Sequence, residues 1–365
     1  MINIKNIVMH VFTGASVATA LLLVFVGYSD RINPVSHPVL ACVGMTLPFF
    51  IIANLVFLVA WVFIKWKRIW IPLVGLLIAY APIRTYFPMH GSSKVPEGCI
   101  KVVSYNVCGY SGNKDFGKNC IDSICDYLKR QKPHIVCLQE DVNTGIPTLE
   151  RMADIFPFND TVHINTSEKY PNVVGIHSRY PIIRKERIPF KSEANGSVAF
   201  YLKIGKQEVI VINNHLESFH LNPDDRENYK NILKGEMGSK QMETETRTLI
   251  KKVSDAMALR APQADAVHHF IETHKRYPTI VCGDFNDTPI SYVRRTIAKD
   301  LIDCYVETGT GAGISYNQKG FSFRIDQMMC SNHFHPFRCE VDDAIKASDH
   351  YPIKCWLRLD GHFQK

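Results

Sequence analysis

Residues 279–289 read TIVCGDFNDTP. The apolar run Ile280–Cys282 predicts a short buried strand, which ends at Gly283. Polar side chains that follow such a strand point out at the edge of a sheet, where α/β proteins bind ligands. Asp284 and Asn286 are two residues apart, so an extended backbone directs both to the same side, and a carboxylate beside a carboxamide suits work on water and a phosphoryl oxygen. Taken alone, the same letters also fit a strand followed by an ordinary Asp/Asn turn.

Several other apolar strands in the sequence also end in polar residues. The expected strands cover residues 100–107, 135–138, 208–213, 323–330 and 353–357. The polar residues in or beside them are Asn106, Glu140, His215, Asp326, Asp349 and His350. Together these types form one chemical set, because carboxylate oxygens suit Mg²⁺ or Mn²⁺ and histidine with aspartate can move protons.

Each of these residues also has an ordinary explanation when it is considered alone. Asn106 could serve in a turn, Glu140 could sit at a helix N-terminus, and His215 could be a hydrogen-bonded core histidine. Asp349 could cap the segment before Pro352. One shared site explains all of these residues, whereas the ordinary reading needs a separate explanation for each. We therefore expect one site built from strand ends.

The remaining pattern of residues 99–365 alternates many strands with a few helices, which predicts a layered α/β domain with largely antiparallel sheets. A helix is expected over 249–274 with a break near Pro262, and a strand over 303–307. Residues 218–245 are polar and charged. We call this segment the excursion. Because it follows His215 closely in the sequence, we expect it on the surface beside the mouth of the site.

Six motifs of the sequence resemble the motif series of the endonuclease/exonuclease/phosphatase family, which shares its fold with deoxyribonuclease I. They are SYN at 104–106, LQE at 138–140, NHLES at 214–218, GDFN at 283–286, RIDQ at 324–327 and SDHYP at 348–352. The resemblance covers about residues 100–359 in the same order. It implies a four-layer α/β sandwich: two sheets packed face to face, helices outside, and the site at one edge between the sheets.

The resemblance also implies roles for individual residues. Asn106 and Glu140 would hold the metal ion, Mg²⁺ or Mn²⁺, with Asp349 near it. Asp284 would orient or deprotonate the attacking water, and Asn286 would contact the scissile phosphate.

Three further residues and one arginine complete the implied set. Asp326 would orient His350, His215 would stabilise or protonate the phosphate side, and Arg179 would reach a substrate phosphate. The expected reaction is hydrolysis of a phosphodiester or phosphomonoester by water, with no covalent nucleophile.

The substrate stays open among a lipid headgroup, a nucleic acid and a small molecule, because the family contains nucleases, sphingomyelinases, inositol-phosphate phosphatases and deadenylases. A nuclease acting on DNA or RNA outside the cytoplasm is one alternative. A catalytically silent membrane receptor or scaffold is another, and it predicts the loss of a metal or proton-transfer residue. None is missing from this sequence.

The first ninety residues differ in kind from the rest. Residues 7–27 and 39–64 are uncharged apolar runs as long as a bilayer requires, about 20 residues. A third run, 69–87, spans only if Arg84 reaches the interface. We therefore expect a membrane segment of three helices over 1–90, a Gly/Ser/Pro linker over 91–98, and a catalytic domain over 99–365.

Charge follows the same division. Residues 1–98 contain seven Lys or Arg and two Asp or Glu, a net charge of +5, so only +2 of the chain's +7 remains for residues 99–365. This nearly neutral domain disfavours DNA binding, which depends on phosphate neutralisation. Lys5 and the basic loop 65–68 should stay in the cytoplasm. If the third run crosses the membrane, the catalytic domain lies outside the cytoplasm, on an inner or plasma membrane. The eleven cysteines show no disulfide framework.

Overall fold

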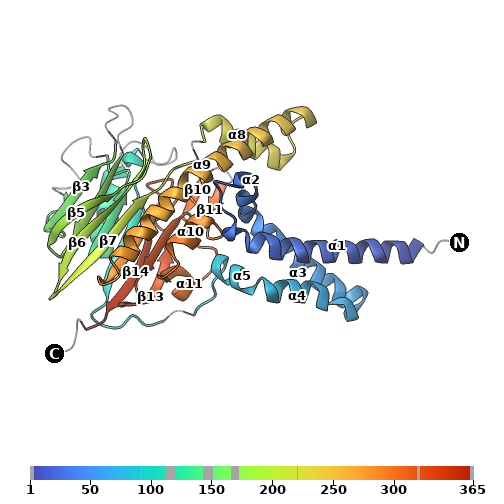
Figure 1. Ribbon diagram of the computed structural model, residues 1–365, viewed down its shortest axis with the longest axis horizontal. Coiled ribbons are helices and arrows are strands. Elements are labelled where there is room, and N and C mark those ends of the chain that lie inside the picture. The colour runs from blue at the N-terminus through green and yellow to red at the C-terminus, as the bar shows by residue number, and fades with distance from the viewer. Residues whose placement is uncertain are drawn as a thin grey trace.

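The structure is a computed structural model of the 365-residue chain. It describes residues 4–91, 93–111, 120–142, 151–165, 172–219, 221–318 and 321–361. A layered α/β body lies at one end of the molecule, and a slender group of helices extends from it toward the N-terminus (Figure 1). The strand ends that carry the polar residues all belong to the layered body.

Two six-stranded sheets form the middle of the layered body. The first has the order β13–β14–β1–β2–β4–β3, which are Phe334–Val341, Ile353–Leu359, Ile100–Asn106, Ile135–Gln139, Val173–Ser178 and Phe158–His163. The second has the order β5–β6–β7–β8–β12–β9, which are Ile182–Ile188, Gly196–Ile204, Gln207–His215, Thr279–Asp284, Asp326–Cys330 and Ile302–Asp303. In the described part of the chain, β1–β2 and β7–β8 pair in parallel and the other pairs are antiparallel.

The two sheets pack face to face, and helices cover their outer faces. Val102 and Cys137 of the first sheet pack between the sheets with Phe200, Val211 and Cys282 of the second. Helix α6 (Cys120–Gln131) covers the first sheet, while α9 (Ser239–Thr273) and α10 (Tyr292–Ile297) cover the second (Figure 1). Because central strands are buried on both faces, their sequences are continuous apolar runs. The four-layer α/β sandwich expected from the sequence is confirmed.

A buried polar network joins the two sheets at the ends of β2 and β7. Gln139 Nε2 donates to Asn213 Oδ1 at 2.6 Å and to Ser104 Oγ at 3.1 Å. Asn213 Nδ2 donates in turn to the carbonyl oxygens of Leu138 and Gly175, at 3.0 and 2.9 Å. Buried polar groups are costly unless they are hydrogen-bonded, so this network favours one register of the two sheets directly beneath the strand ends.

Two sequence-based expectations about secondary structure are wrong. The excursion 218–245, for which the sequence predicted no particular element, contains helix α8 (Pro223–Lys234) and the start of α9. Helix α9 is continuous through Pro262, because Ala261, Ala264 and Val267 are buried in the core and hold the flanking turns. The strand expected over 303–307 is helix α11 (Cys304–Thr308), since the Asp303 side chain caps it by accepting from Val306 N at 3.0 Å.

The N-terminal segment contains two helices long and apolar enough to cross a membrane, Ile4–Arg31 and Pro38–Ile64. These stretches contain α1 (Ile4–Gly27) and α3 (Leu47–Ile64). We call each of these apolar stretches a passage. The third passage is a pair of helices bent by 62° relative to each other, which contains α4 (Trp70–Ile78) and α5 (Tyr80–Tyr86). The three expected apolar helical stretches are therefore present, the third as a bent pair.

The surface and interior of this helical group are the reverse of those of a water-soluble bundle. The outward face of α3 exposes large apolar side chains, such as Val56 and Phe63. Polar groups lie inside, where Trp61 Nε1 donates to Ser16 Oγ at 3.0 Å. At the α1–α4 contact, a Cβ on Gly75 would lie 2.9 Å from the Ala20 Cβ, so this packing requires a glycine. Small residues and internal hydrogen bonds at helix contacts are typical of membrane bundles.

The helical group packs directly on the layered body. The buried Arg324 side chain donates to the carbonyl oxygens of Thr85 at 2.5 Å and Tyr86 at 3.4 Å, at the C-terminal end of α5. A cation that satisfies terminal helix carbonyls is favourable. Ile290 of the body also belongs to the apolar cluster of the helices. Arg324 precedes Asp326 by two residues, so the helices are attached close to a strand end that carries a site residue.

Arg260 is a fully buried cation of α9 that holds the segment after β7. Its Nη1 donates to Glu217 O at 2.8 Å, and its Nε lies 3.3 Å from Asp287 Oδ2. Arg260→Ala would leave Asp287 buried without its counter-charge. We expect a loss of about 3–5 kcal/mol in the free energy of unfolding, measured by denaturant unfolding of the full chain in detergent.

The matched control for this prediction is Lys251→Ala on the same helix. Lys251 forms an exposed pair with Asp255 at 2.7 Å, and such surface pairs contribute little. If both substitutions had equally small effects, the Arg260–Asp287 pair would not stabilise the fold.

Candidate active site

Strands from both sheets end at one edge of the sandwich, and the register brings their terminal residues together. His215 pairs with Asp284 across β7 and β8, and Asp326 pairs with Asp284 across β12 and β8. From the first sheet, Asn106 ends β1 and Glu140 follows β2. The site expected from the strand ends is therefore assembled at the edge between the sheets.

Asp284 lies at the centre of this group. Its Oδ1 accepts from Asn286 N at 2.8 Å, and its Oδ2 accepts from Asn106 Nδ2 at 3.0 Å. The Nε2 atoms of His350 and His215 lie 3.6 and 3.9 Å from the same Oδ2. Burial raises the pKa of Asp284 to about 6, against the opposing effect of the His350 charge. A carboxylate with a raised pKa is a better proton acceptor than an ordinary aspartate.

His350 is held between two carboxylates. Its Nδ1 lies 2.8 Å from Asp326 Oδ2, and its Nε2 faces Asp284. Burial alone would lower the pKa of His350, but the charges of Asp326 and Asp284 outweigh it and raise the pKa well above its ordinary value. His350 and Asp326 are both buried, so their arrangement keeps a positive charge on His350 beside Asp284.

His215 differs from His350 in charge. Burial lowers its pKa, so a neutral imidazole is favoured. The ring is oriented by Asn172, whose Nδ2 lies 2.9 Å from His215 Nδ1 and donates to Ala194 O at 2.6 Å. Asn172 Oδ1 also lies 3.2 Å from His215 Nδ1, so this amide can accept from Nδ1 or donate to it, and Nε2 faces Glu140 and Asp284. The sequence carried no signal for Asn172, because it belongs to none of the motifs.

Glu140 and Asp349 provide carboxylate oxygens on the first-sheet side of the site, while the Oδ1 of the neighbouring Asn106 accepts from Cys108 N at 3.0 Å. Glu140 and Asp349 line the same cavity, and Asn106 Nδ2 donates to Glu140 Oε1 at 3.1 Å. Burial raises the pKa of Glu140, the Asn106 hydrogen bond opposes this rise, and the negative charge of Asp349 adds to it. Two carboxylates that repel each other in one cavity favour a cation between them, and carboxylate and amide oxygens are the donors that Mg²⁺ and Mn²⁺ prefer.

Backbone geometry turns two of these side chains into the site. Glu140 has φ 53° and Asn286 has φ 51°, both in the left-handed region. Asparagine tolerates this region, whereas glutamate rarely adopts it, and such strain concentrates at functional sites. Asn286 Nδ2 donates to Leu216 O at 2.9 Å. Because a primary amide has two N–H donors, one remains for a ligand.

A cavity of about 280 Å³ lies in front of these residues. Its floor comes from the strand ends, and one wall comes from the segment after β7, including Ser218, Phe219, Leu221 and Arg226. The expectation that the excursion 218–245 lies beside the mouth of the site is therefore confirmed. Further walls come from the hairpin of β10 (Tyr316–Gln318) and β11 (Phe321–Phe323).

Arg179 requires a correction. Its backbone N donates to His134 O at 2.9 Å, and Ser178 pairs with Ile135 at the beginning of β2, whereas Glu140 follows the end of that strand. His134 precedes Glu140 by six residues, so Arg179 lies about 20 Å along the strand from Glu140, taking about 3.3 Å per residue. The half-buried Arg226 of α8 supplies a cationic side chain in the cavity instead. Its position depends on how α8 packs, which no motif indicates.

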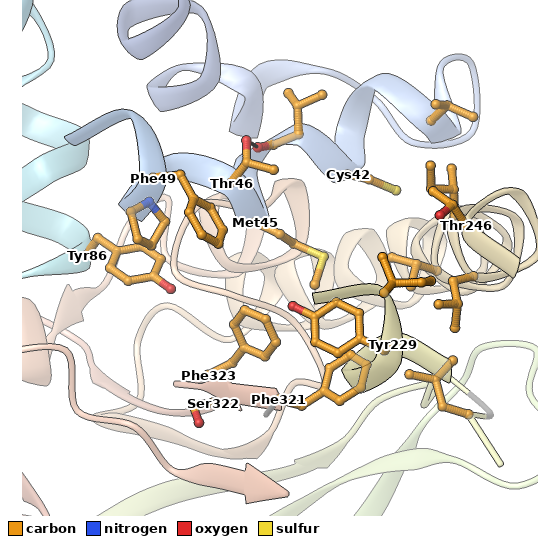
Figure 2. Close-up of a pocket in the computed structure, with 18 residues that line it drawn as sticks. Cys42, Met45, Thr46, Phe49, Tyr86, Tyr229, Thr246, Phe321, Ser322 and Phe323 are labelled. Atoms are coloured by element: carbon orange, nitrogen blue, oxygen red, sulfur yellow. Dashed lines mark hydrogen bonds between the residues drawn. The ribbon is translucent and has the colours of Figure 1, made fainter. Parts of the chain in front are cut away.

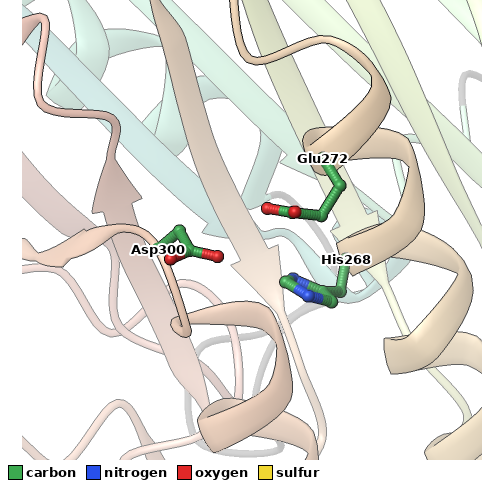
Figure 3. A group of neighbouring side chains, drawn as sticks. All are labelled: His268, Glu272 and Asp300. Carbon is green, nitrogen blue, oxygen red and sulfur yellow. The ribbon is translucent and has the colours of Figure 1, made fainter.

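A second group of potential ligands lies away from this cavity. Figure 3 shows His268 and Glu272 of α9 close to Asp300, with ligand atoms within 4.8 Å of one another. Lys275 Nζ already lies 2.8 Å from Glu272 Oε2 and 3.9 Å from Asp300 Oδ2. The lysine ammonium provides the counter-charge there, and we assign no ion to this group.

Family models match both parts of the chain. Residues 103–350 match the model described as "Endonuclease/Exonuclease/phosphatase family". The chain belongs to this family. Residues 9–86 match a model described as "Domain of unknown function (DUF8431)". No curated protein matches the chain. Family membership agrees with the assembled motifs and assigns the layered body a phosphoesterase or nuclease fold.

Solved structures show the same fold at low sequence identity. A mannosyl-6-phosphatase from Bacteroides thetaiotaomicron VPI-5482 is 17% identical, with a TM-score of 0.50 over 71% of this chain and 100% of that chain. The human Nocturnin catalytic domain with bound sulfate anion is 14% identical, with a TM-score of 0.51 over 73% of this chain and 96% of that chain. At these identities the likeness concerns the fold alone.

Proposed function

We propose that this protein is a membrane-anchored, divalent-metal-dependent hydrolase that cleaves a phosphate ester by attack of water. The observation that carries the proposal is the pairing around Asp284. A carboxylate with a raised pKa lies between a charged His350 and a neutral His215, at the floor of one cavity. Groups whose environments separate their protonation states in this way suit acid–base chemistry.

Glu140, Asp349 and Asn106 would hold the metal ion, Mg²⁺ or Mn²⁺. A bound divalent ion neutralises charge on phosphoryl oxygens and polarises the phosphorus centre. The chemistry of the donors fits such an ion, because Glu140 and Asp349 are carboxylates in one cavity and the pKa of Glu140 is raised. The carboxamide oxygen of Asn106 would exchange its hydrogen bond from Cys108 N for the ion.

The other residues act on water and on the phosphoryl group. Asp284 orients the attacking water and accepts its proton, for which its raised pKa is suitable. The imidazolium of His350 stabilises the negative charge that develops on the phosphoryl oxygens. In the tautomer with its proton on Nε2, His215 would donate a hydrogen bond to the phosphoryl group, and Asn286 would donate from the amide N–H that does not bind Leu216 O. Arg226 contributes a positive charge at the mouth of the cavity.

The proposal is tested with the full chain in detergent and Mg²⁺, against DNA, sphingomyelin, phosphoinositides and bis-p-nitrophenyl phosphate. We expect hydrolysis of at least one of these esters, and its loss with EDTA and in Asp284→Asn. No activity on any ester, or activity that is insensitive to EDTA, would contradict the proposal.

Glu140→Ala should weaken the metal site specifically. We expect the Mg²⁺ concentration for half-maximal activity to rise at least about 10-fold, since even residues that only support ligands typically change affinity by 10- to 100-fold. Titration calorimetry with Mn²⁺ measures the same change without catalysis. Glu243→Ala, on the exposed surface of α9, is the matched control. Unchanged metal affinity in Glu140→Ala would exclude Glu140 as a ligand.

The arrangement of the helices supports a catalytic domain outside the cytoplasm. Arg68 of the basic loop 65–68 donates to Met9 O at 3.4 Å, so this loop lies beside the N-terminal half of α1. Figure 1 shows the layered body at the opposite end of the helices. Because basic loops stay in the cytoplasm, the three passages would place residues 99–365 on the other side, after a linker at 91–98.

Cysteine labelling tests this topology. In a background with the partly exposed Cys42 and Cys108 replaced by serine, Lys346→Cys should react with a membrane-impermeant maleimide in intact cells. Lys67→Cys should react only after permeabilisation. The reverse labelling pattern would place the catalytic domain in the cytoplasm.

A further inference from the structure

A second, larger cavity lies where the N-terminal helices meet the layered body. Its volume is about 530 Å³, within the usual range of ligand sites. Figure 2 shows its walls: the beginning of the second apolar passage contributes Met45 and Phe49, helices α8 and α9 contribute Tyr229 and Thr246, and strand β11 contributes Phe321. None of its 18 lining residues is charged or a histidine. This lining suits an uncharged, largely apolar occupant.

This junction cavity shares a wall with the active-site cavity. Leu221, Phe321 and Phe323 line both. Tyr229 stacks on Phe321 with ring centroids 4.1 Å apart, so the same aromatic hairpin separates the polar strand ends from the apolar space. The two cavities therefore adjoin, so a molecule with a phosphate at one end and a hydrocarbon at the other would contact both if it lay over this wall.

The junction cavity also meets the surface that the helices present to the bilayer. Phe49 lines the cavity, is 64% exposed, and lies on α3, whose outward residues Ile52 and Val56 are also exposed. Val39 and Ile250, at 55% and 41% exposure, line it as well. The cavity therefore lies at the level where the apolar helices end and the catalytic body begins (Figure 1), which is where a lipid can leave the bilayer.

We propose that the junction cavity holds the hydrocarbon chain of the substrate, so that the substrate is an amphiphilic phosphate ester whose phosphate lies in the active site. This inference rests on the proposed phosphoesterase function and names its substrate class. The protein would draw the ester from the membrane surface, with the chain in the cavity and the headgroup at Asp284. Hydrolysis then adds water across the P–O bond and releases an alcohol and a phosphate product.

The test uses the full chain in amphipol and a series of p-nitrophenyl alkyl phosphodiesters with two to twelve carbons, below their micelle concentrations. Each methylene that enters the cavity should improve kcat/KM about three- to fourfold, mainly through KM. Val253→Trp, which fills the cavity from α9, should remove this chain-length dependence. Its activity on bis-p-nitrophenyl phosphate, which has no alkyl chain, should stay within about twofold of wild type.

Two further variants keep the result interpretable. Leu259→Phe enlarges an exposed apolar side chain of the same helix outside the cavity, so it should keep the wild-type chain-length dependence. Ile232→Trp fills the cavity from α8 and replaces Val253→Trp if that variant fails to fold. If wild type shows no chain-length dependence, or if the filling variants lose activity equally on both substrates, the inference is overturned.

A photoactivatable phospholipid with a diazirine at the end of its acyl chain provides a readout independent of catalysis. We expect crosslinks within residues 39–49 and 246–253, and their loss in Val253→Trp. Crosslinks that persist in Val253→Trp, or that fall only on the outer face of α3, would overturn the inference. Crosslinks in the cavity without a chain-length effect would identify a structural lipid and also overturn it. Hydrolysis of bis-p-nitrophenyl phosphate separates these outcomes from failure of the proposed function, because that failure would abolish all activity.

Discussion

Asp284→Asn is expected to lower turnover by about 10²–10⁴-fold, the range for loss of a positioned general base. Asparagine keeps the shape of the side chain and one oxygen, which can still accept from Asn286 N. It removes the carboxylate whose pKa is raised to about 6 by burial, and with it the proton acceptor for the attacking water. The measurement is kcat for bis-p-nitrophenyl phosphate, with thermal unfolding as the check on the fold.

Asp255→Asn is the matched control, because it makes the same chemical change at an exposed position of α9. Its turnover should equal that of wild type. If Asp284→Asn retained most of its turnover while remaining folded, the water would be activated by another group and the proposed mechanism would be wrong.

Asp326 and His350 are expected to act as one unit. Asp326→Ala and His350→Ala should each lower kcat by on the order of 10²-fold or more, in the range of charge-stabilising groups. The double variant should lose little beyond the worse single variant. The physical reason is the 2.8 Å contact between His350 Nδ1 and Asp326 Oδ2, through which the carboxylate keeps the imidazole charged and oriented.

The affinity for metal should distinguish the Asp326–His350 pair from Glu140. Neither Asp326→Ala nor His350→Ala should change the affinity for Mn²⁺ by more than about twofold, whereas Glu140→Ala should weaken it. Losses that add in the double variant would show that the two residues act independently. Full activity in His350→Ala would remove the imidazolium from the reaction.

The attachment of the N-terminal helices to the layered body bears on both the proposed hydrolase function and the proposed amphiphilic substrate. Arg324 binds the carbonyl oxygens at the end of α5 and stands in the same segment as Asp326. The active site is therefore held at a constant place relative to the apolar helices. A rigid attachment of this kind suits a substrate that is shared between the bilayer surface and the site, whereas a soluble substrate would be reached equally well by a freely tethered domain.

The residues of the candidate site were accessible from the sequence because their signals are local. A buried strand that ends in a polar residue is visible in a few letters, as in TIVCGDFND, and parallel or antiparallel pairing then brings such ends to one edge. Eight residues expected at the site lie together there, and these are Asn106, Glu140, His215, Asp284, Asn286, Asp326, Asp349 and His350. The apolar helices were equally visible, since a membrane span is set by length and hydropathy.

The sequence by itself thus determined the fold class, the strand-end residues and the apolar passages, all of which follow from short-range patterns. Only the tertiary structure decided that Arg226, and not Arg179, supplies the cation of the cavity, that Asn172 orients His215, and that α9 continues through Pro262. These depend on packing between segments far apart in the chain. The junction cavity is the clearest case, because its walls join residues 39–49 to residues 221–253 and 321–323, and no local pattern records how such distant surfaces meet.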